Sequence, residues 1–277
     1  MDVSGISTFA APAAKAARRL PFVTLSFLVA MGATEVTFAF VGATAGIVCA
    51  AVVTAALLGV AVLDPSTARA ADDSRERLQA IDVLPVLALV PLLRIVSLTI
   101  PVRDLPQIYW YAVTGVPLLV ALVLTGRFFG PTWSRDTFAF GWSRTQALIG
   151  LGGLPVGLIA YLVLRPARIE PHLTPRIFLL GLLILIPFNA LMEELLFRGA
   201  VQRVLVTLFG DLGTAAAAVL FMATYLGTRS APYIVLVGLT GFAFGRCVRQ
   251  TGSLAGAVVA HALVSIGLIL VWPYAIG

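Results

Sequence analysis

The stretch from residue 43 to residue 63, ATAGIVCAAVVTAALLGVAVL, contains no charged side chain and decides the class of fold. A helix of about 20 apolar residues is long enough to cross the hydrocarbon core of a bilayer. The first two apolar runs share one stretch that contains Glu35, so they form either two spans or a short interfacial helix and one span. The sequence therefore predicts an all-α, polytopic transmembrane bundle of about eight spans, or nine if both runs cross. The apolar runs cover residues 22–40, 43–63, 81–100, 106–125, 146–164, 176–198, 213–227, 233–247 and 253–273.

The composition of the whole chain agrees with this prediction. The 277 residues are 60% hydrophobic and 12% charged, whereas soluble domains carry roughly 25% charged residues. This composition excludes a soluble globule and a disordered chain, and a chain with only Cys49 and Cys247 is no disulfide scaffold. The net charge of +6 is spread in ones to threes between apolar segments, as in membrane loops. We therefore expect the lipid bilayer as a partner, and no nucleic acid.

The distribution of basic residues predicts the orientation of the spans. With a cytoplasmic N-terminus and nine spans, thirteen of the nineteen lysine and arginine residues fall on the inner side, five on the outer side and Arg94 within a span. By the positive-inside rule this favours a cytoplasmic N-terminus, and we expect a multi-pass protein of a bacterial plasma membrane. The predicted organisation is a cytoplasmic segment at 1–20, N-terminal helices and loops at 21–145, and a motif-bearing membrane core at 146–277. A cleaved signal peptide ending at the A-x-A of residues 43–45 is the alternative, although such a leader is overlong.

Ionisable side chains within the apolar runs are the candidates for chemistry, because a charge in lipid costs at least about 2.5–3.5 kcal/mol. The densest cluster is NALMEELLFRG at residues 189–199. Glu194 and Arg198 are four residues apart, the spacing of an intrahelical ion pair. Glu193 points about 100° away from Glu194 on a helix and shares a face with Asn189, so it is free to act as a general base within the bundle. The alternative is that both glutamates lie at the cytoplasmic end of a span and extend to water.

His261 is the one histidine within an apolar run, and Ser265 lies four residues later on the same helix face. On its own, such a histidine is better explained as a packing residue. A rise of 1.5 Å per residue places His261 about 12 Å beyond Ser253, and Glu193 about 7.5 Å from Arg198. If both reference residues lie at the cytoplasmic edge, His261 and Glu193 have comparable depth. The sequence then favours one site shared by the two side chains.

Residues 193–199 and 261–265 resemble two motifs of the CPBP family of intramembrane proteases, which includes CAAX prenyl endopeptidases and bacteriocin-processing proteins. The first motif is E-E-x-x-x-R, usually in the form E-E-x-x-F-R-G, and this chain has EELLFRG. The last motif is H-x-x-x-N, and here His261 is followed by Ser265 in the asparagine position. The resemblance extends over roughly residues 145–270.

The resemblance implies a membrane-embedded endopeptidase that cleaves a hydrophobic or prenylated, CAAX-like peptide. In this family a glutamate and a histidine activate water, a second histidine and an asparagine hold the oxyanion, and no metal or other cofactor is required. Carried over to this chain, Glu193 is the catalytic base. Glu194 and Arg198 form a structural pair, and His261 and Ser265 donate hydrogen bonds to the oxyanion.

The middle family motif departs from the usual pattern. This motif, F-x-x-x-H, falls at residues 221–225 and has Tyr225 in place of the histidine. A phenol, with a reference pKa of about 10, is a poor base at neutral pH. By helix rise Tyr225 lies about 18 Å past Gly213, which predicts a deeper position than those of Glu193 and His261. The alternative function is therefore a catalytically impaired CPBP-like protein that binds a peptide or a membrane partner without cleaving it.

The ionisable residues within the apolar runs are also compatible with two other functions. A small transporter or channel would use Glu35, Arg94 and Glu193 along a pathway, although no inverted repeat is evident in the sequence. A metal site built from Glu193, Glu194 and His261 has one imidazole and no thiolate, which is a poor ligand set for zinc. The sequence leaves open whether Glu35 and Arg94 pair.

Overall fold

The computed structural model describes residues 10–63, 80–100, 105–129 and 139–277, and the regular elements in these ranges are all helical. Within them, nine helical segments are long and apolar enough to cross a membrane. Each predicted span overlaps one of these segments, which confirms the all-α, multi-pass bundle. The segments are Arg19–Phe40, Ala43–Leu63, Asp82–Thr99, Gln107–Phe128, Arg144–Leu164, Pro175–Phe209, Asp211–Thr228, Ala231–Thr251 and Ala255–Ala275.

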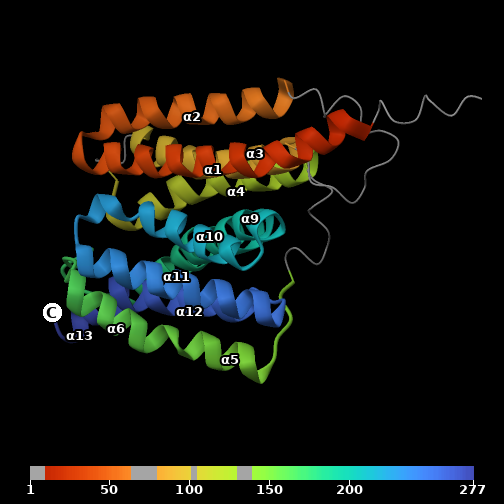
Figure 1. Cartoon of the computed structure of the whole chain (residues 1–277). Coiled ribbons are helices and arrows are strands. Elements are labelled where there is room, and N and C mark those ends of the chain that lie inside the picture. Colours follow the sequence, from red (N-terminus) through yellow and green to blue (C-terminus); the bar gives the residue numbers. More distant parts are fainter. Residues whose placement is uncertain (1–9, 64–79, 101–104, 130–138) are drawn as a thin grey trace, which may run out of the picture.

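The long run that contains Glu35 forms two separate helices. They are joined at Gly42, whose φ of 144° is a backbone conformation that glycine adopts without the strain other residues incur. Both helices are long and apolar enough to cross a membrane, which favours two spans over a short interfacial helix and one span. In Figure 1, α2 lies at one edge of the bundle, with α1, α3 and α4 beside it. These N-terminal helices are α1 (Ala10–Phe40), α2 (Ala43–Leu63), α3 (Ala80–Thr99) and α4 (Gln107–Phe129).

The later helices form the other part of the bundle. In Figure 1, α5 and α6 follow each other along the edge opposite α2, and α11 and α12 run between that edge and the N-terminal helices. Helix α12 packs against α5 and α6. These helices are α5 (Arg144–Leu151), α6 (Gly153–Leu164), α10 (Asp211–Ala223), α11 (Ala231–Thr251), α12 (Ala255–Ile266) and α13 (Trp272–Ala275), with the π-helical turn η5 (Gly267–Val271) between the last two.

The helical segment at 175–209 is longer than predicted. The sequence predicted its end at Arg198, but the helix continues to Phe209. Arg198 is only 4% exposed and pairs with Glu194, so its charge is balanced inside the bundle and does not mark the membrane surface. The segment consists of α7 (Pro175–Leu185), the π-helical η2 (Ile186–Leu191), α8 (Met192–Glu194), the π-helical η3 (Leu195–Val201) and α9 (Gln202–Phe209).

Two π-helical stretches thus flank the short helix that carries the paired glutamates. A π turn inserts an extra residue into an α-helix, widens it locally, and is frequent at functional sites. Pro187 lies within the first of them and has no backbone N–H to donate to the regular α-helical ladder. The local distortion changes which side chains of this segment face the bundle interior.

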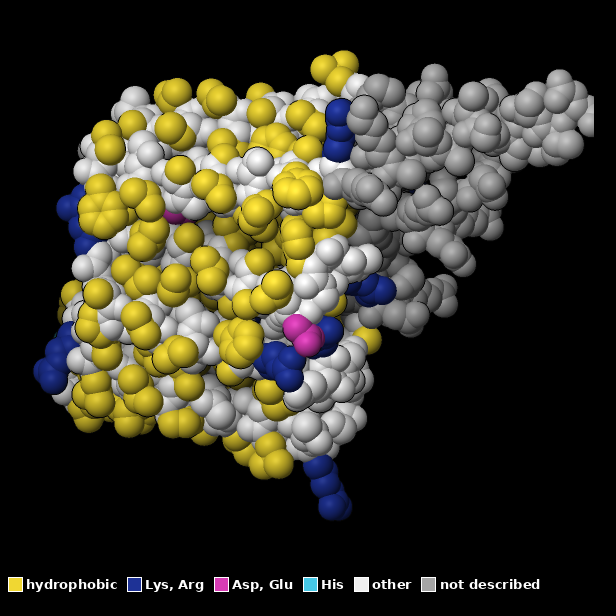
Figure 2. All heavy atoms as spheres, in the orientation of Figure 1, with side chains coloured by type: hydrophobic (Ala, Val, Ile, Leu, Met, Phe, Trp, Pro, Cys, Tyr) yellow, Lys and Arg dark blue, Asp and Glu magenta, His cyan; other side chains and the backbone are white. Residues whose placement is uncertain are grey.

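The outer surface is apolar, as expected for a protein surrounded by lipid. Large hydrophobic side chains such as Phe22, Leu183 and Leu239 are more than half exposed. Figure 2 shows hydrophobic side chains over most of one face, with basic side chains gathered at its two ends. A water-soluble protein rarely exposes a contiguous apolar surface of this extent. The chain is an integral, multi-pass membrane protein.

A buried ion pair joins the N-terminal helices to the end of α10. Arg94 Nε donates to Glu35 Oε2 at 2.9 Å, and the Glu35 residue is 2% exposed. Arg94 Nη2 also donates to the carbonyl oxygen of Thr224 at 2.7 Å. The structure thus answers the question left open by the sequence, because Glu35 and Arg94 pair. Their contact with Thr224 connects α1 and α3 to the residue immediately before Tyr225.

Candidate active site

Glu193 lies on α8 and receives a hydrogen bond from a residue that is distant in sequence. Tyr225 Oη donates to Glu193 Oε2 at 3.0 Å, and the Glu193 side chain is 14% exposed. The prediction that Tyr225 lies deeper than Glu193 is wrong, because it took Arg198 as the end of the helix. Measured from Phe209, Glu193 is about 24 Å along its helix, and Tyr225 is about 21 Å past Asp211.

His261 on α12 faces both glutamates. Its Nδ1 lies 2.8 Å from Glu194 Oε1, and its Nε2 lies 3.8 Å from Glu193 Oε2. A carboxylate can only accept hydrogen bonds, so this network assigns a hydrogen to Nδ1. The second nitrogen then points toward Glu193, at a separation longer than a direct hydrogen bond. The structure therefore brings Glu193, Tyr225 and His261 together.

Glu194 is fully buried and accepts hydrogen bonds from both Arg198 and His261 at one oxygen, Oε1. Arg198 Nη1 donates to Glu194 Oε1 at 3.0 Å, in the spacing of four residues expected for an intrahelical pair. Arg198 also donates to the carbonyl oxygen of Gly241 at 3.1 Å, and its guanidinium lies 4.3 Å from the centre of the Phe221 ring. The interpretation that both glutamates extend to water at a helix end is therefore wrong.

Ser265 is hydrogen-bonded to a side chain from another helical segment. Asn189 Nδ2 donates to Ser265 Oγ at 2.7 Å, which links the helix of Glu193 to that of His261. Asn189 was not predicted as a site residue, although its position one turn before Glu193 was a usable signal. No sequence pattern pointed to Tyr111 and Tyr233, which line the same cavity from α4 and α11.

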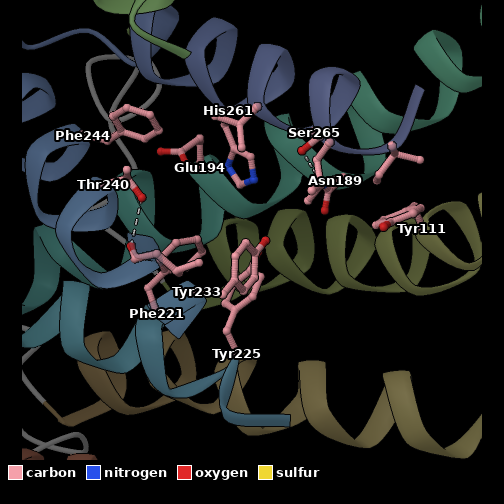
Figure 3. Close-up of a pocket in the computed structure, with 14 residues that line it drawn as sticks. Tyr111, Asn189, Glu194, Phe221, Tyr225, Tyr233, Thr240, Phe244, His261 and Ser265 are labelled. Atoms are coloured by element: carbon pink, nitrogen blue, oxygen red, sulfur yellow. Dashed lines mark hydrogen bonds and ion pairs between the residues drawn. The ribbon is translucent and has the colours of Figure 1, made fainter. Parts of the chain in front are cut away.

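A cavity of about 110 Å³ within the bundle is lined by Glu194, His261, Tyr225, Asn189 and Ser265, among others. Glu193 is not in the lining itself but contacts the lining residue Tyr225. The cavity wall is mostly apolar, with a small number of convergent polar groups, which is the usual character of a small-molecule or substrate site. Figure 3 shows Glu194, His261, Ser265 and Asn189 on one side of the cavity and the rings of Phe221, Tyr225 and Tyr233 opposite. The remaining labelled lining residues are Tyr111, Thr240 and Phe244.

The site contains two carboxylates, one guanidinium and one imidazole. Among the residues that the structure describes, no group of three or more His, Cys, Asp and Glu side chains is arranged to hold a metal ion. The carboxylates and the imidazole can transfer protons, and all four groups can form hydrogen bonds. A carboxylate near an imidazole, with a second carboxylate orienting that imidazole, is an arrangement able to move a proton to and from a bound water.

Comparison with known proteins gives one match. A family model described as type II CAAX prenyl endopeptidase, Rce1-like, matches residues 175–267. This segment begins at α7, ends just after α12, and contains the glutamates, Tyr225 and His261. Comparison with curated proteins and with solved structures gave no match.

Proposed function

We propose that the chain hydrolyses a peptide bond in a hydrophobic or lipid-modified, CAAX-like peptide, as a member of the CPBP family of intramembrane proteases. The match of residues 175–267 to the model of Rce1-like type II CAAX prenyl endopeptidases supports this proposal. The observation that carries the proposal is the close approach of Glu193 to His261 and Tyr225, two residues that line the cavity. The segment that matches the family model supplies most of the residues that line this cavity, and Tyr111, Leu268 and Ile269 come from outside it. The substrate reaches it from the bilayer, and no nucleic acid or cofactor takes part.

Glu193 is the general base in this proposal. Its carboxylate removes a proton from a water molecule while the water oxygen bonds to the carbonyl carbon of the substrate. The electron pair of the C=O double bond moves to the carbonyl oxygen and forms an oxyanion. When this intermediate collapses, the C–N bond breaks and Glu193 returns the proton to the leaving amine. Tyr225 donates to Glu193 Oε2 and leaves Oε1 to accept the proton.

His261 stabilises the oxyanion in this scheme. With Nδ1–H held by Glu194, a protonated imidazole presents Nε2–H to the cavity. Glu194 accepts hydrogen bonds from both the imidazole and the Arg198 guanidinium, so this buried carboxylate is paired with a cation. Glu194 and Arg198 thus position His261 and do not contact the substrate.

The test of the proposal is cleavage of a fluorogenic farnesylated peptide by purified protein in detergent, compared with the same peptide without its lipid. We expect Glu193→Gln to lower kcat by about 10²–10⁴, the usual contribution of general-base catalysis. Glu170→Gln is the matched control, since it removes the same charge from an exposed loop residue and should leave kcat unchanged. Wild-type protein that is inert, or a Glu193→Gln variant as active as wild type, contradicts the proposal.

The Tyr225 hydroxyl favours a second candidate function, that of a binding protein with impaired catalysis. Its hydrogen bond occupies Oε2 of Glu193, the oxygen that also faces His261. A bulky phenol therefore stands where a base and a water molecule would otherwise fit. Such a protein holds a hydrophobic peptide in the cavity but turns it over slowly.

Replacement of Tyr225 with histidine distinguishes these two functions. Imidazole is shorter than phenol and accepts protons near neutral pH, so Tyr225→His opens space for water beside Glu193 and adds a base. We expect kcat to rise by at least about tenfold, a conservative part of the range for general-base assistance. Activity that appears only in this variant identifies the native protein as a binder. Tyr225→Phe is the control for loss of the phenol, and an equal gain in both variants contradicts the role assigned to the new base.

A further inference from the structure

Asn189 and Ser265 form a polar pair in an otherwise apolar part of the cavity wall. Asn189 Nδ2 lies 2.7 Å from Ser265 Oγ, and the two residues are 8% and 5% exposed. The wall of the same cavity also contains the apolar side chains of Val264, Leu268 and Ile269. Polar groups in such surroundings are unfavourable unless their hydrogen-bonding capacity is used.

The pair retains hydrogen-bond donors that no described residue uses. A side-chain amide carries two N–H donors, and Asn189 gives one of them to Ser265. Ser265 accepts that bond, which leaves its own O–H to donate. Among the described residues, neither the second amide hydrogen nor this hydroxyl hydrogen has an acceptor in the structure. Both side chains line the cavity, so the free donors are available to a bound molecule.

The position of the pair relative to Glu193 and His261 fits a peptide carbonyl group. Asn189 precedes Glu193 by four residues, and Ser265 follows His261 by four residues. Each step is about 6 Å along its helix. In Figure 3, Asn189 and Ser265 point toward each other directly beside the His261 ring. A carbonyl carbon placed near Glu193 can therefore direct its oxygen toward His261 and this pair.

We infer that the Asn189 amide, together with the Ser265 hydroxyl, binds the carbonyl oxygen of the scissile peptide bond and stabilises the oxyanion formed from it. The inference rests on the proposed function and assigns to Asn189 a direct catalytic role that the motif resemblance does not give it. As the neutral substrate carbonyl becomes an oxyanion, its hydrogen bonds to these donors strengthen, so the pair acts mainly on kcat.

The pair also connects two helices, so the experiment separates catalysis from a purely structural contact. Asn189→Leu keeps the approximate size of the side chain and removes both amide donors. The exchange variant Asn189→Ser with Ser265→Asn places the amide on α12 and the hydroxyl on η2, so the pair and its donors are retained. The probes are a farnesylated peptide and its analogue with a phosphinate in place of the scissile amide, which carries the negative charge of the intermediate.

We expect Asn189→Leu to lower kcat about 10²–10³-fold, the effect of losing one oxyanion donor, with little change in KM. The affinity for the phosphinate should fall by a similar factor, while binding of the parent peptide is retained. The exchange variant should recover at least about tenfold in both measurements. The phosphinate measurement does not require turnover, so it tests Asn189 even if wild-type protein proves unable to cleave.

Three results overturn the inference. The first is an Asn189→Leu variant with wild-type kcat and phosphinate affinity. The second is equal loss of affinity for peptide and phosphinate with a lowered thermal midpoint and no recovery on exchange, which identifies a structural contact only. The third is failure of the wild-type protein to bind the phosphinate more tightly than the peptide. Equal cleavage by wild type and Glu193→Gln, by contrast, contradicts the proposed base and leaves the phosphinate comparison to decide on Asn189.

Discussion

Replacement of Glu194 with glutamine is expected to lower both the stability and the activity of the protein. The change leaves the Arg198 guanidinium buried without its carboxylate, and breaking a buried ion pair costs about 3–5 kcal/mol. For a chain of this size that corresponds to a fall in thermal midpoint of about 6–20 °C. His261 also loses the carboxylate that fixes its Nδ1 hydrogen, and kcat should fall about 10³–10⁴-fold, as when an amide replaces the orienting carboxylate of a catalytic triad. Thermal unfolding in detergent and the peptide-cleavage assay measure the two effects.

The double variant Glu194→Gln with Arg198→Met separates the two causes. It removes both charges, so most of the lost thermal stability should return, while His261 remains without its orienting carboxylate and kcat remains low. A double variant no more stable than the single one contradicts the role of the unpaired guanidinium. A single variant as active as wild type shows that orientation of His261 by Glu194 is not required.

Replacement of Arg94 with methionine should also destabilise the bundle, although it lies outside the segment that matches the protease family. The Glu35 carboxylate, 2% exposed, loses its cationic partner. The expected cost is again about 3–5 kcal/mol, or about 6–20 °C in thermal midpoint. The hydrogen bond to the Thr224 carbonyl is lost as well, so the backbone before Tyr225 is held less firmly.

Two further variants make this result interpretable. Arg94→Met combined with Glu35→Gln leaves no isolated buried charge and should recover most of the stability. Arg127→Met removes an exposed arginine at the end of α4 and should change stability by no more than about 0.5 kcal/mol. If Arg94→Met unfolds at the same temperature as Arg127→Met, the buried ion pair does not contribute to stability as argued.

The fold was predictable because each helix carries its own signal. An apolar run such as residues 43–63 needs no knowledge of its neighbours to be identified as a span. The prediction failed at Arg198, where charge was taken as the end of a helix. That inference holds only for a side chain that reaches water, and Arg198 is instead paired with Glu194 inside the bundle. Whether a charge is paired is a property of the packed structure.

The site was predictable only in part, for a related reason. The pairing of Glu193 with His261 was predicted from the motifs, although the depth of Glu193 was underestimated because Arg198 was taken as the end of its helix. The contact of Tyr225 with Glu193 depends on where two different helices end, and the same error made Tyr225 appear deeper than Glu193. Asn189 was evident as a neighbour of Glu193, but its partner Ser265 is 76 residues away. Such contacts between helices leave no local pattern in the sequence.

The size of the cavity has a mechanical consequence. A volume of about 110 Å³ is well below the roughly 300–1,000 Å³ of a typical ligand pocket, and an extended peptide needs more room. Under the proposed function, entry of a peptide substrate requires neighbouring helices to move apart against the surrounding acyl chains. The work of displacing lipid becomes part of the activation free energy of each catalytic cycle. Lateral pressure and bilayer thickness would then set the turnover rate of this protein alongside the chemistry of its side chains.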